Sequence, residues 1–365
     1  MSVTRKLHDL GQSIWLDNLS RGLLNTGALE RYINDFSVTG ITSNPTIFYH
    51  AIQHSRDYDE AIRRNWAPGR PVDSLREIVI DDIRQAADLL RPIYDATGGL
   101  DGWVSLEVSP VLADDAAATV AAAKRLYAAA ERPNVFIKIP GTPAGLRAIE
   151  ESIFEGIPIN VTLLFTRRQY VAAAEAYLYG IERRIAAGLN PQVASVASLF
   201  VSRWDVAVRD KAPEPLVNRL GVNVARQTYE TYRSLLDTPR WQRILDAGAR
   251  PQRLLWASTG TKDPVASDIF YITSLIAPST ITTMPEATLR AFAEHGDIGH
   301  ILPIHARYCD HTLDEFAKAG IDVDALGRQL QNEGVEAFAK SWNALVECIS
   351  TKGESLRSET AGVSS

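Results

Sequence analysis

Short runs of apolar residues, many of them β-branched, alternate with longer amphipathic segments along most of this chain. A strand that is buried on both faces forms a short continuous apolar run, so this alternation is typical of an α/β fold with a parallel sheet. Eight such runs predict a closed (β/α)8 TIM barrel. The predicted strands are Ser13–Asp17, Gly40–Asn44, Trp103–Ser109, Val135–Pro140, Ile159–Phe165, Val193–Phe200, Leu254–Ser258 and about Thr280–Met284.

The chain has 365 residues, more than the roughly 250 of a typical barrel. The surplus falls in Tyr49–Val72, in about Asp210–Arg250 and after Gly299, where we expect extra helices. Residues 1–350 are predicted to form a single catalytic barrel domain. The polar tail, residues 351–365, is predicted to be disordered because it offers little apolar surface to bury.

Four Ser or Thr residues precede a Glu or Gln by three positions, which is the spacing of a helix capping box. We therefore expect helices to begin near Ser74, Thr166, Thr283 and Thr312.

Composition excludes several classes of protein. The formal charge of −6 argues against a general nucleic-acid surface, although it allows a local cationic pocket. The two cysteines, Cys309 and Cys348, form no zinc-ligand motif, so neither a metal nor a cofactor is predicted, and a reducing cytoplasm fits best. No signal peptide and no membrane-spanning run is visible. The oligomeric state stays open.

Successive side chains of a strand point to opposite faces, so each predicted strand has a face toward the helices and a face toward the barrel interior. In Val135–Pro140 the bulky Val and Ile residues share one face, and Phe136 and Lys138 share the other. The same division assigns Leu163, Leu255 and Ala257 to outward faces. The inward residues predicted for five further strands are Ser13, Trp15, Asp17, Ser105, Glu107, Ser109, Asn160, Thr162, Ser198, Phe200, Trp256 and Ser258.

Lys138 is the most informative of these residues. A lysine within a buried strand loses the hydration that favours its charged form, and a neutral amine can attack a carbonyl to form a Schiff base. The alternative is a lysine near the strand end whose aliphatic stem carries the amine to solvent. The polar residues late in several other strands favour the first interpretation, because catalytic residues of such barrels gather at the C-terminal strand ends.

Four ordered segments resemble signature motifs of the transaldolase family: Gly40–Phe48, Phe136–Thr142, Ile159–Phe165 and Ser198–Asp205. Their order and spacing match that family over about Leu10–Pro285. The resemblance implies a class I aldolase-type barrel of the non-oxidative pentose phosphate pathway. Such an enzyme moves a dihydroxyacetone unit from sedoheptulose 7-phosphate or fructose 6-phosphate to glyceraldehyde 3-phosphate or erythrose 4-phosphate. Its partners are therefore small sugar phosphates.

The resemblance also implies roles for single residues. Lys138 would form the Schiff base, Asp17 would act as general acid and base, and Glu107 would position a catalytic water that Thr162 helps to hold. The remaining expected substrate-binding residues are Thr42, Asn44, Asn160, Ser198, Phe200, Arg203, Ser258 and Lys262, with the asparagines on sugar hydroxyls and the last three on phosphate.

Two segments depart from the family pattern. The run Ser198–Arg203 reads Ser-Leu-Phe-Val-Ser-Arg, where many relatives have Ser-Pro-Phe-Val-Gly-Arg. Many relatives also place an arginine shortly after the serine that corresponds to Ser258, whereas this chain has Lys262 nearby. The second phosphate-binding residue is therefore open, and Lys262 is the candidate.

Two other functions stay open at this point. A fructose 6-phosphate aldolase-like lyase would use the same lysine and release free dihydroxyacetone. A non-catalytic barrel would bind sugar phosphates without a reducible Schiff base. Glu107, Phe200 and the length of the chain resemble transaldolases rather than the aldolase sister group.

Overall fold

The computed structural model describes residues 1–304 and 307–363. Within them, eight parallel strands close into a barrel in sequence order, and β8 pairs with β1. The predicted TIM barrel is confirmed, with small shifts of the strand ends. The strands are β1 (Gln12–Asp17), β2 (Val38–Thr42), β3 (Trp103–Glu107), β4 (Val135–Pro140), β5 (Ile159–Leu164), β6 (Ser195–Phe200), β7 (Arg253–Ala257) and β8 (Thr280–Met284).

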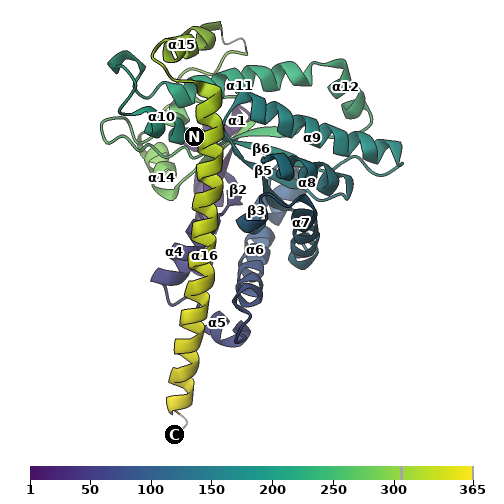
Figure 1. Ribbon diagram of the computed structural model, residues 1–365, viewed down its shortest axis with the longest axis vertical. Coiled ribbons are helices and arrows are strands. Elements are labelled where there is room, and N and C mark those ends of the chain that lie inside the picture. The colour runs from purple at the N-terminus through teal and green to yellow at the C-terminus, as the bar shows by residue number, and fades with distance from the viewer. Residues whose placement is uncertain (305–306, 364–365) are drawn as a thin grey trace.

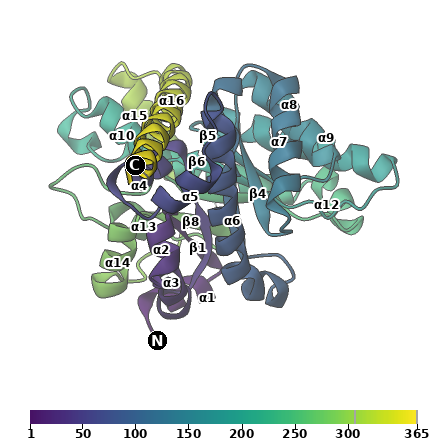
Figure 2. The same ribbon diagram turned by 90° about the horizontal axis from the view of Figure 1, so that it is seen from below.

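Helices surround the barrel (Figures 1 and 2), and extra helices fall in the three predicted regions. The first half of the chain contributes α1 (Val3–Asp9), α2 (Arg21–Asn25), α3 (Ala28–Phe36), α4 (Pro45–His54), α5 (Asp59–Asn65), α6 (Pro71–Ala96), α7 (Ala116–Ala130), α8 (Pro143–Phe154) and α9 (Arg167–Ala186). The second half contributes α10 (Ser202–Val208), α11 (Leu220–Leu236), α12 (Pro239–Asp246), α13 (Phe270–Ser274), α14 (Glu286–His295), α15 (Arg307–Lys318) and α16 (Val323–Val363).

One of the four predicted helix starts is confirmed. Thr166 caps α9 with a complete capping box. Ser74 lies inside α6, which begins at Pro71 because proline suits the first helical position. Thr312 lies inside α15. Thr283 belongs to β8, where its hydroxyl donates to the carbonyl of Trp256, so α14 begins only at Glu286.

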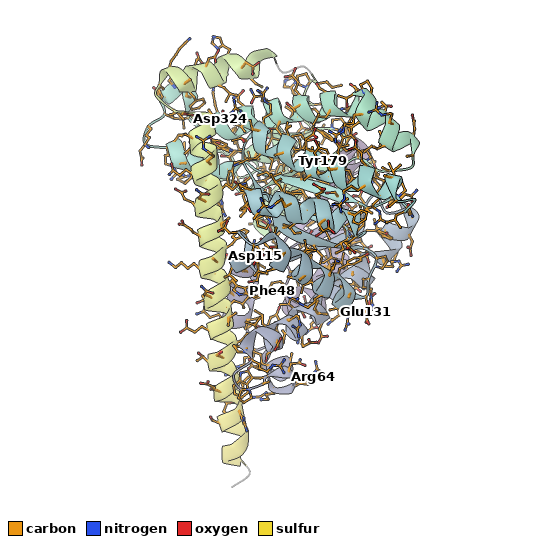
Figure 3. The ribbon with its side chains drawn as sticks, turned by 45° about the vertical axis from the view of Figure 1, so that its right-hand side comes forward. Phe48, Arg64, Asp115, Glu131, Tyr179 and Asp324 are labelled. Atoms are coloured by element: carbon orange, nitrogen blue, oxygen red, sulfur yellow. The ribbon has the colours of Figure 1, made fainter. Side chains whose placement is uncertain are left out.

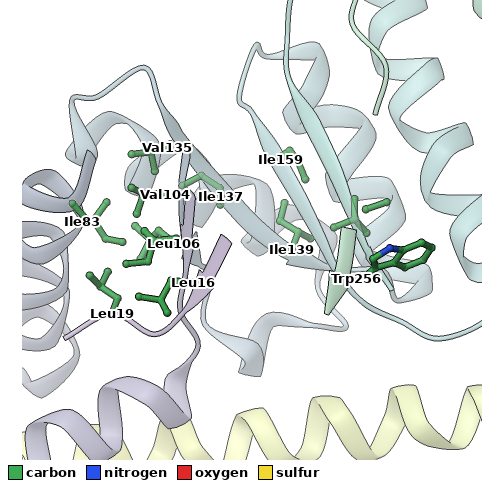
Figure 4. Close-up of a cluster of buried hydrophobic side chains, with 14 of the residues drawn as sticks. Leu16, Leu19, Ile83, Val104, Leu106, Val135, Ile137, Ile139, Ile159 and Trp256 are labelled. Carbon is green, nitrogen blue, oxygen red and sulfur yellow. The ribbon is translucent and has the colours of Figure 1, made fainter. Parts of the chain in front are cut away.

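The two faces of the strands have different partners. Outward aliphatic residues, such as Val104, Ile137 and Ile139, pack against the surrounding helices in one large cluster (Figure 4). Inside the barrel, Trp103 stacks on Phe136 with ring centroids 4.0 Å apart. Trp15 packs next to Phe136, with ring centroids 6.0 Å apart. Since Phe136 precedes Lys138 by two residues on the same face, these rings fill the layer below the polar strand ends.

The predicted face assignments are wrong for four residues in two strands. In β7, Leu255 and Ala257 face the interior, whereas Trp256 faces outward and its indole donates to the carbonyl of Leu275. In β5, Leu163 has a φ of 57°, which breaks the alternation, and its side chain joins the interior cluster. Ser258 still reaches the interior end because its own φ of 55° turns the chain after the strand. Strict alternation fails at residues with left-handed backbone geometry.

Helix α16 runs the length of the molecule in Figure 1 and lies against α4, α5 and α6. One face of α16 also lies across the end of the barrel at which the strands terminate. Gln331 donates to the carbonyl oxygens of Gly141 and Leu163, at 3.1 and 2.9 Å. Gly334 makes this approach possible, because a Cβ there would lie 2.9 Å from the Leu163 side chain. The C-terminal helix therefore covers part of the end of the barrel where the strands terminate.

The prediction of a disordered tail needs correction, because α16 continues through residue 363. Three contacts hold this part against α5 and its surroundings. Lys352 Nζ donates to the Ser55 carbonyl at 2.8 Å and forms an ion pair with Asp59 at 3.3 Å, and Gly353 packs on the ring of Trp66. The residues of this segment are mostly polar, but its small residues and its residues with long aliphatic stems are spaced so that they contact a neighbouring surface.

Candidate active site

A cavity of about 100 Å³ opens at the C-terminal end of the barrel. Seven of the eight β-strands, all except β3, contribute side chains to it, as do the residue before α4, the turn after β7, α10 and α16. It is lined by Asp17, Thr42, Asn44, Lys138, Thr162, Ser198, Phe200, Arg203, Leu255, Ala257, Ser258, Thr283 and Phe338. Parallel strands bring their carboxyl ends to one edge, so residues far apart in the sequence meet here.

Lys138 reaches the floor of this cavity from β4. Its amine donates to the carbonyl oxygen of Ser43 at 2.9 Å and lies 3.3 Å from Oε2 of Glu107. The side chains of Lys138 and Glu107 are only 7% and 6% exposed. The lysine is therefore enclosed beside a carboxylate and does not reach out along its stem to bulk solvent. The strand register explains the pairing, because Glu107 stands directly opposite Lys138.

Two oxygens near the lysine lack ordinary hydrogen bonds. Apart from its ion pair with Lys138, the buried Oε2 of Glu107 has no hydrogen-bond partner among the described residues, nor has Oγ1 of Thr162. Burial raises the pKa of Glu107, and the neighbouring charge of Lys138 opposes that rise. Buried polar atoms normally find a partner, so each of these two oxygens can form a hydrogen bond with an additional polar group such as water.

Asp17 ends β1 on the same side of the barrel. Burial raises the pKa of its carboxyl, and the positive charges of Lys138 and Lys262 counteract part of the rise. A carboxyl with a raised pKa holds a proton more strongly and is better suited both to accept one and to return it.

Arg203 supplies a cation at the rim of the cavity, at the start of α10. Its guanidinium carbon lies 5.2 Å from the ring centroid of Phe200 and 5.8 Å from that of Phe338. The two rings hold the guanidinium between β6 and α16 by cation–π contact. Burial lowers the pKa of Arg203, but a guanidinium stays charged in proteins.

Comparison with known proteins places this geometry in a family. A family model described as Transaldolase/Fructose-6-phosphate aldolase matches residues 14–349. A transaldolase of Acidothermus cellulolyticus is 45% identical over 97% of this chain and 98% of its own length. The chain belongs to the transaldolase family. Further relatives are transaldolases of a Parafrankia species, 44% identical over 95% of this chain and 98% of the relative, and of Thermobifida fusca, 43% identical over 95% and 97%.

In this member of the transaldolase family, the two asparagines expected to bind sugar hydroxyls have different surroundings. Asn44 lines the cavity while its side-chain oxygen accepts from the amide of Ile47 and so caps α4. Asn160 stands opposite Lys138 in the register of β4 and β5. Its amide donates to Ser105 Oγ at 3.0 Å, and its oxygen accepts from Ser198 Oγ at 2.7 Å. Among the described residues, Asn160 is therefore bonded to two serines and is not part of the cavity lining.

The two other predicted phosphate ligands also differ in position. Ser258 lines the cavity, and its Oγ lies 2.9 Å from Oγ of Ser202, the residue that departs from the glycine common in transaldolases. Lys262 is exposed and is not in the lining, yet its Nζ lies 3.7 Å from a Cβ built on Gly260. The side chain thus folds back toward the barrel, close enough for its charge to lower the pKa of Asp17.

Strand alternation missed four lining residues of this transaldolase-family site: Thr283, Leu255, Ala257 and Phe338. Alternation along β8 could have found Thr283, and the irregular end of β7 hid Leu255 and Ala257. Phe338 has no such signal, because a helical apolar face does not say which surface it covers.

Within the described part of the chain, no three His, Cys, Asp or Glu side chains are grouped as metal ligands. Of the helices in residues 1–304 and 307–363, none is long and apolar enough to cross a membrane.

Proposed function

We propose that this protein is a transaldolase that moves a dihydroxyacetone unit from a ketose phosphate to an aldose phosphate through a Schiff base on Lys138. The observation that carries the proposal is the enclosed lysine amine, 3.3 Å from the Glu107 carboxylate and in one cavity with Asp17. The similarity to transaldolases of other bacteria supports the transfer reaction.

The Schiff base supplies the electron sink that carbon–carbon cleavage requires. The amine of Lys138 adds to the ketone carbon, and loss of water leaves a protonated imine. Asp17 takes the proton of the substrate hydroxyl, the carbon–carbon bond breaks, and its electron pair passes to the imine as an enamine. The acceptor aldehyde then takes up the enamine carbon, and Asp17 returns its proton to the new hydroxyl.

Water is consumed and released in this cycle, and Glu107 with Thr162 would hold it. Imine formation expels one water, and imine hydrolysis at the end uses one. Two buried oxygens without an ordinary hydrogen bond support this role: Oε2 of Glu107, beside the lysine amine, and Oγ1 of Thr162, in the cavity that Lys138 lines. Glu107 would move protons to and from this water, because its pKa is raised above that of an ordinary glutamate.

The phosphate of either substrate would bind at the rim. Arg203 is the strongest candidate, because a guanidinium held in one plane binds phosphate oxygens through two hydrogen bonds. Ser258 offers a hydroxyl, and Lys262 offers a second charge. Such substrates belong to the non-oxidative pentose phosphate pathway, and the two cysteines, which form no disulfide, fit a reducing cytoplasm.

Product analysis tests the transfer reaction. Fructose 6-phosphate and erythrose 4-phosphate together should yield a seven-carbon ketose phosphate, whereas fructose 6-phosphate alone should give at most slow release of dihydroxyacetone. Fast acceptor-independent release would instead support the aldolase-like lyase, the second name in the family description. Saturable binding of fructose 6-phosphate with neither product would support the non-catalytic barrel.

A further inference from the structure

A second cavity is lined by Glu107 but not by Lys138. Its volume is about 240 Å³, and it is enclosed by α4, α6, α7 and α16. The two cavities share Asn44, and Glu107 forms part of the wall of the second one. Figure 3 shows Phe48, one of its lining residues, between the barrel and α16. The ion-pair partner of Lys138 therefore faces a space other than the cavity that Lys138 lines.

The second cavity is unsuited to a sugar. Its wall consists mainly of aliphatic and aromatic side chains, among them Leu75, Val79 and Leu345. A polyhydroxylated ligand would leave its hydroxyls without partners there, which costs free energy for each unpaired group. An apolar body of the size of one or two fused rings would instead replace unfavourable contact between water and this surface.

Charged residues at the cavity indicate which polar group a ligand with such an apolar body would carry. Two arginines, Arg76 and Arg125, line it. Arg76 is paired with Asp73 and Glu77. Arg125 is exposed, and no ion pair is recorded for it within residues 1–304 and 307–363. Since Glu107 is buried and Arg125 faces solvent, an acid group would sit at Arg125 with the apolar body directed inward.

We propose that this second cavity binds a small amphipathic monoanion and that its occupation slows catalysis through Glu107. An apolar body against the Glu107 carboxylate would keep water in the second cavity away from it and so favour its protonated form. A protonated Glu107 loses its ion pair with Lys138 and cannot activate water. This effect on catalysis rests on the proposed transaldolase reaction, whereas the binding site itself does not.

Fluorescence titration with 8-anilino-1-naphthalenesulfonate tests the site, because this probe combines fused rings with one sulfonate. We expect one saturable site. Ala122→Phe, which fills the cavity, should abolish binding. Arg125→Ala should weaken it about two- to fivefold, the range of an exposed ion pair. Arg147→Ala, an exposed arginine on α8 outside the cavity lining, is the matched control and should bind like the wild type.

Unchanged affinity in Arg125→Ala would overturn the site, and this variant decides the matter if Ala122→Phe does not fold. With fructose 6-phosphate as donor, the probe should lower kcat and leave KM unchanged. Full activity at saturating probe would overturn the coupling to Glu107. A wild type that is inactive without the probe would refute the proposed function and leave the binding result standing.

Discussion

Nζ of Lys138 lies 3.3 Å from Oε2 of Glu107, and both side chains are almost fully enclosed. Asp17 lines the same cavity as the lysine but ends a different strand, β1. The structure thus offers Lys138 two carboxyl groups in different surroundings, as expected where one group handles water and the other the substrate hydroxyl.

Substitution of the two carboxyls should separate their roles. Glu107→Gln should slow formation of the borohydride-trappable adduct by the ~10²–10⁴-fold typical of a general acid or base. Asp17→Asn should form the adduct but cleave the donor more slowly by a similar factor. Rapid-quench trapping with fructose 6-phosphate measures the first step, and product release measures the second. Normal trapping by Glu107→Gln, with none by Asp17→Asn, would mean that the roles are reversed.

The pH dependence of cleavage should follow Asp17. The base must be deprotonated, so activity is lost as pH falls through the pKa of Asp17, which burial raises above its ordinary value. The charge of Lys262 lowers this pKa. Lys262→Ala should therefore move the acidic limb of the kcat profile to higher pH.

Lys124→Ala is the control for this shift, because Lys124 lies on α7 and pairs with Glu155. Its acidic limb should coincide with that of the wild type. Coincidence of all three profiles would show that Lys262 does not act on the base.

Removal of one ring beside Arg203 should weaken phosphate binding. Phe338→Ala deletes a contact worth about 0.5–2 kcal/mol, so kcat/KM for phosphorylated donors should fall roughly two- to thirtyfold. Phe338→Leu keeps apolar packing and separates the ring from simple burial. Activity with unphosphorylated fructose should change little. An equal loss on both donors would assign Phe338 to the fold and not to the phosphate site.

The sequence predicted the barrel and its interior well wherever strands are regular. Alternation placed Lys138 and Phe136 correctly because β4 has no irregularity. It failed near Leu163 and in β7 before Ser258, where a positive φ shifts the chain by an amount that residue types do not reveal. Ser258 does lie on the interior side, as predicted, but it does so because of its positive φ and not because of strand alternation.

The role of the C-terminal helix could not be predicted in the same way. Its apolar residues indicate a helix but not the surface that the helix covers. Phe338 therefore entered the site only with the structure, and the last turns were mistaken for a disordered tail because Lys352 and Gly353 act through contacts with distant residues. Non-local packing decides both features.

Gly353→Ala should destabilise the protein even though alanine favours helices. In a free helix this change would stabilise by roughly 0.5–1 kcal/mol. Here a Cβ would lie 2.1 Å from the ring of Trp66, so the ring or the helix must move. Thermal unfolding should show a lower Tm. In a Trp66→Ala background the same substitution should be neutral or stabilising, and a decrease there as well would refute the packing explanation.

The most direct measurement of the central claim is borohydride reduction in the presence of fructose 6-phosphate, followed by peptide mapping. We expect one dihydroxyacetone-derived adduct per chain, on the peptide that contains Lys138, together with loss of activity. Lys138→Arg should give no adduct and no activity, because a guanidinium stays protonated and does not condense with a ketone. An adduct on another lysine, or full activity after reduction, would contradict the account.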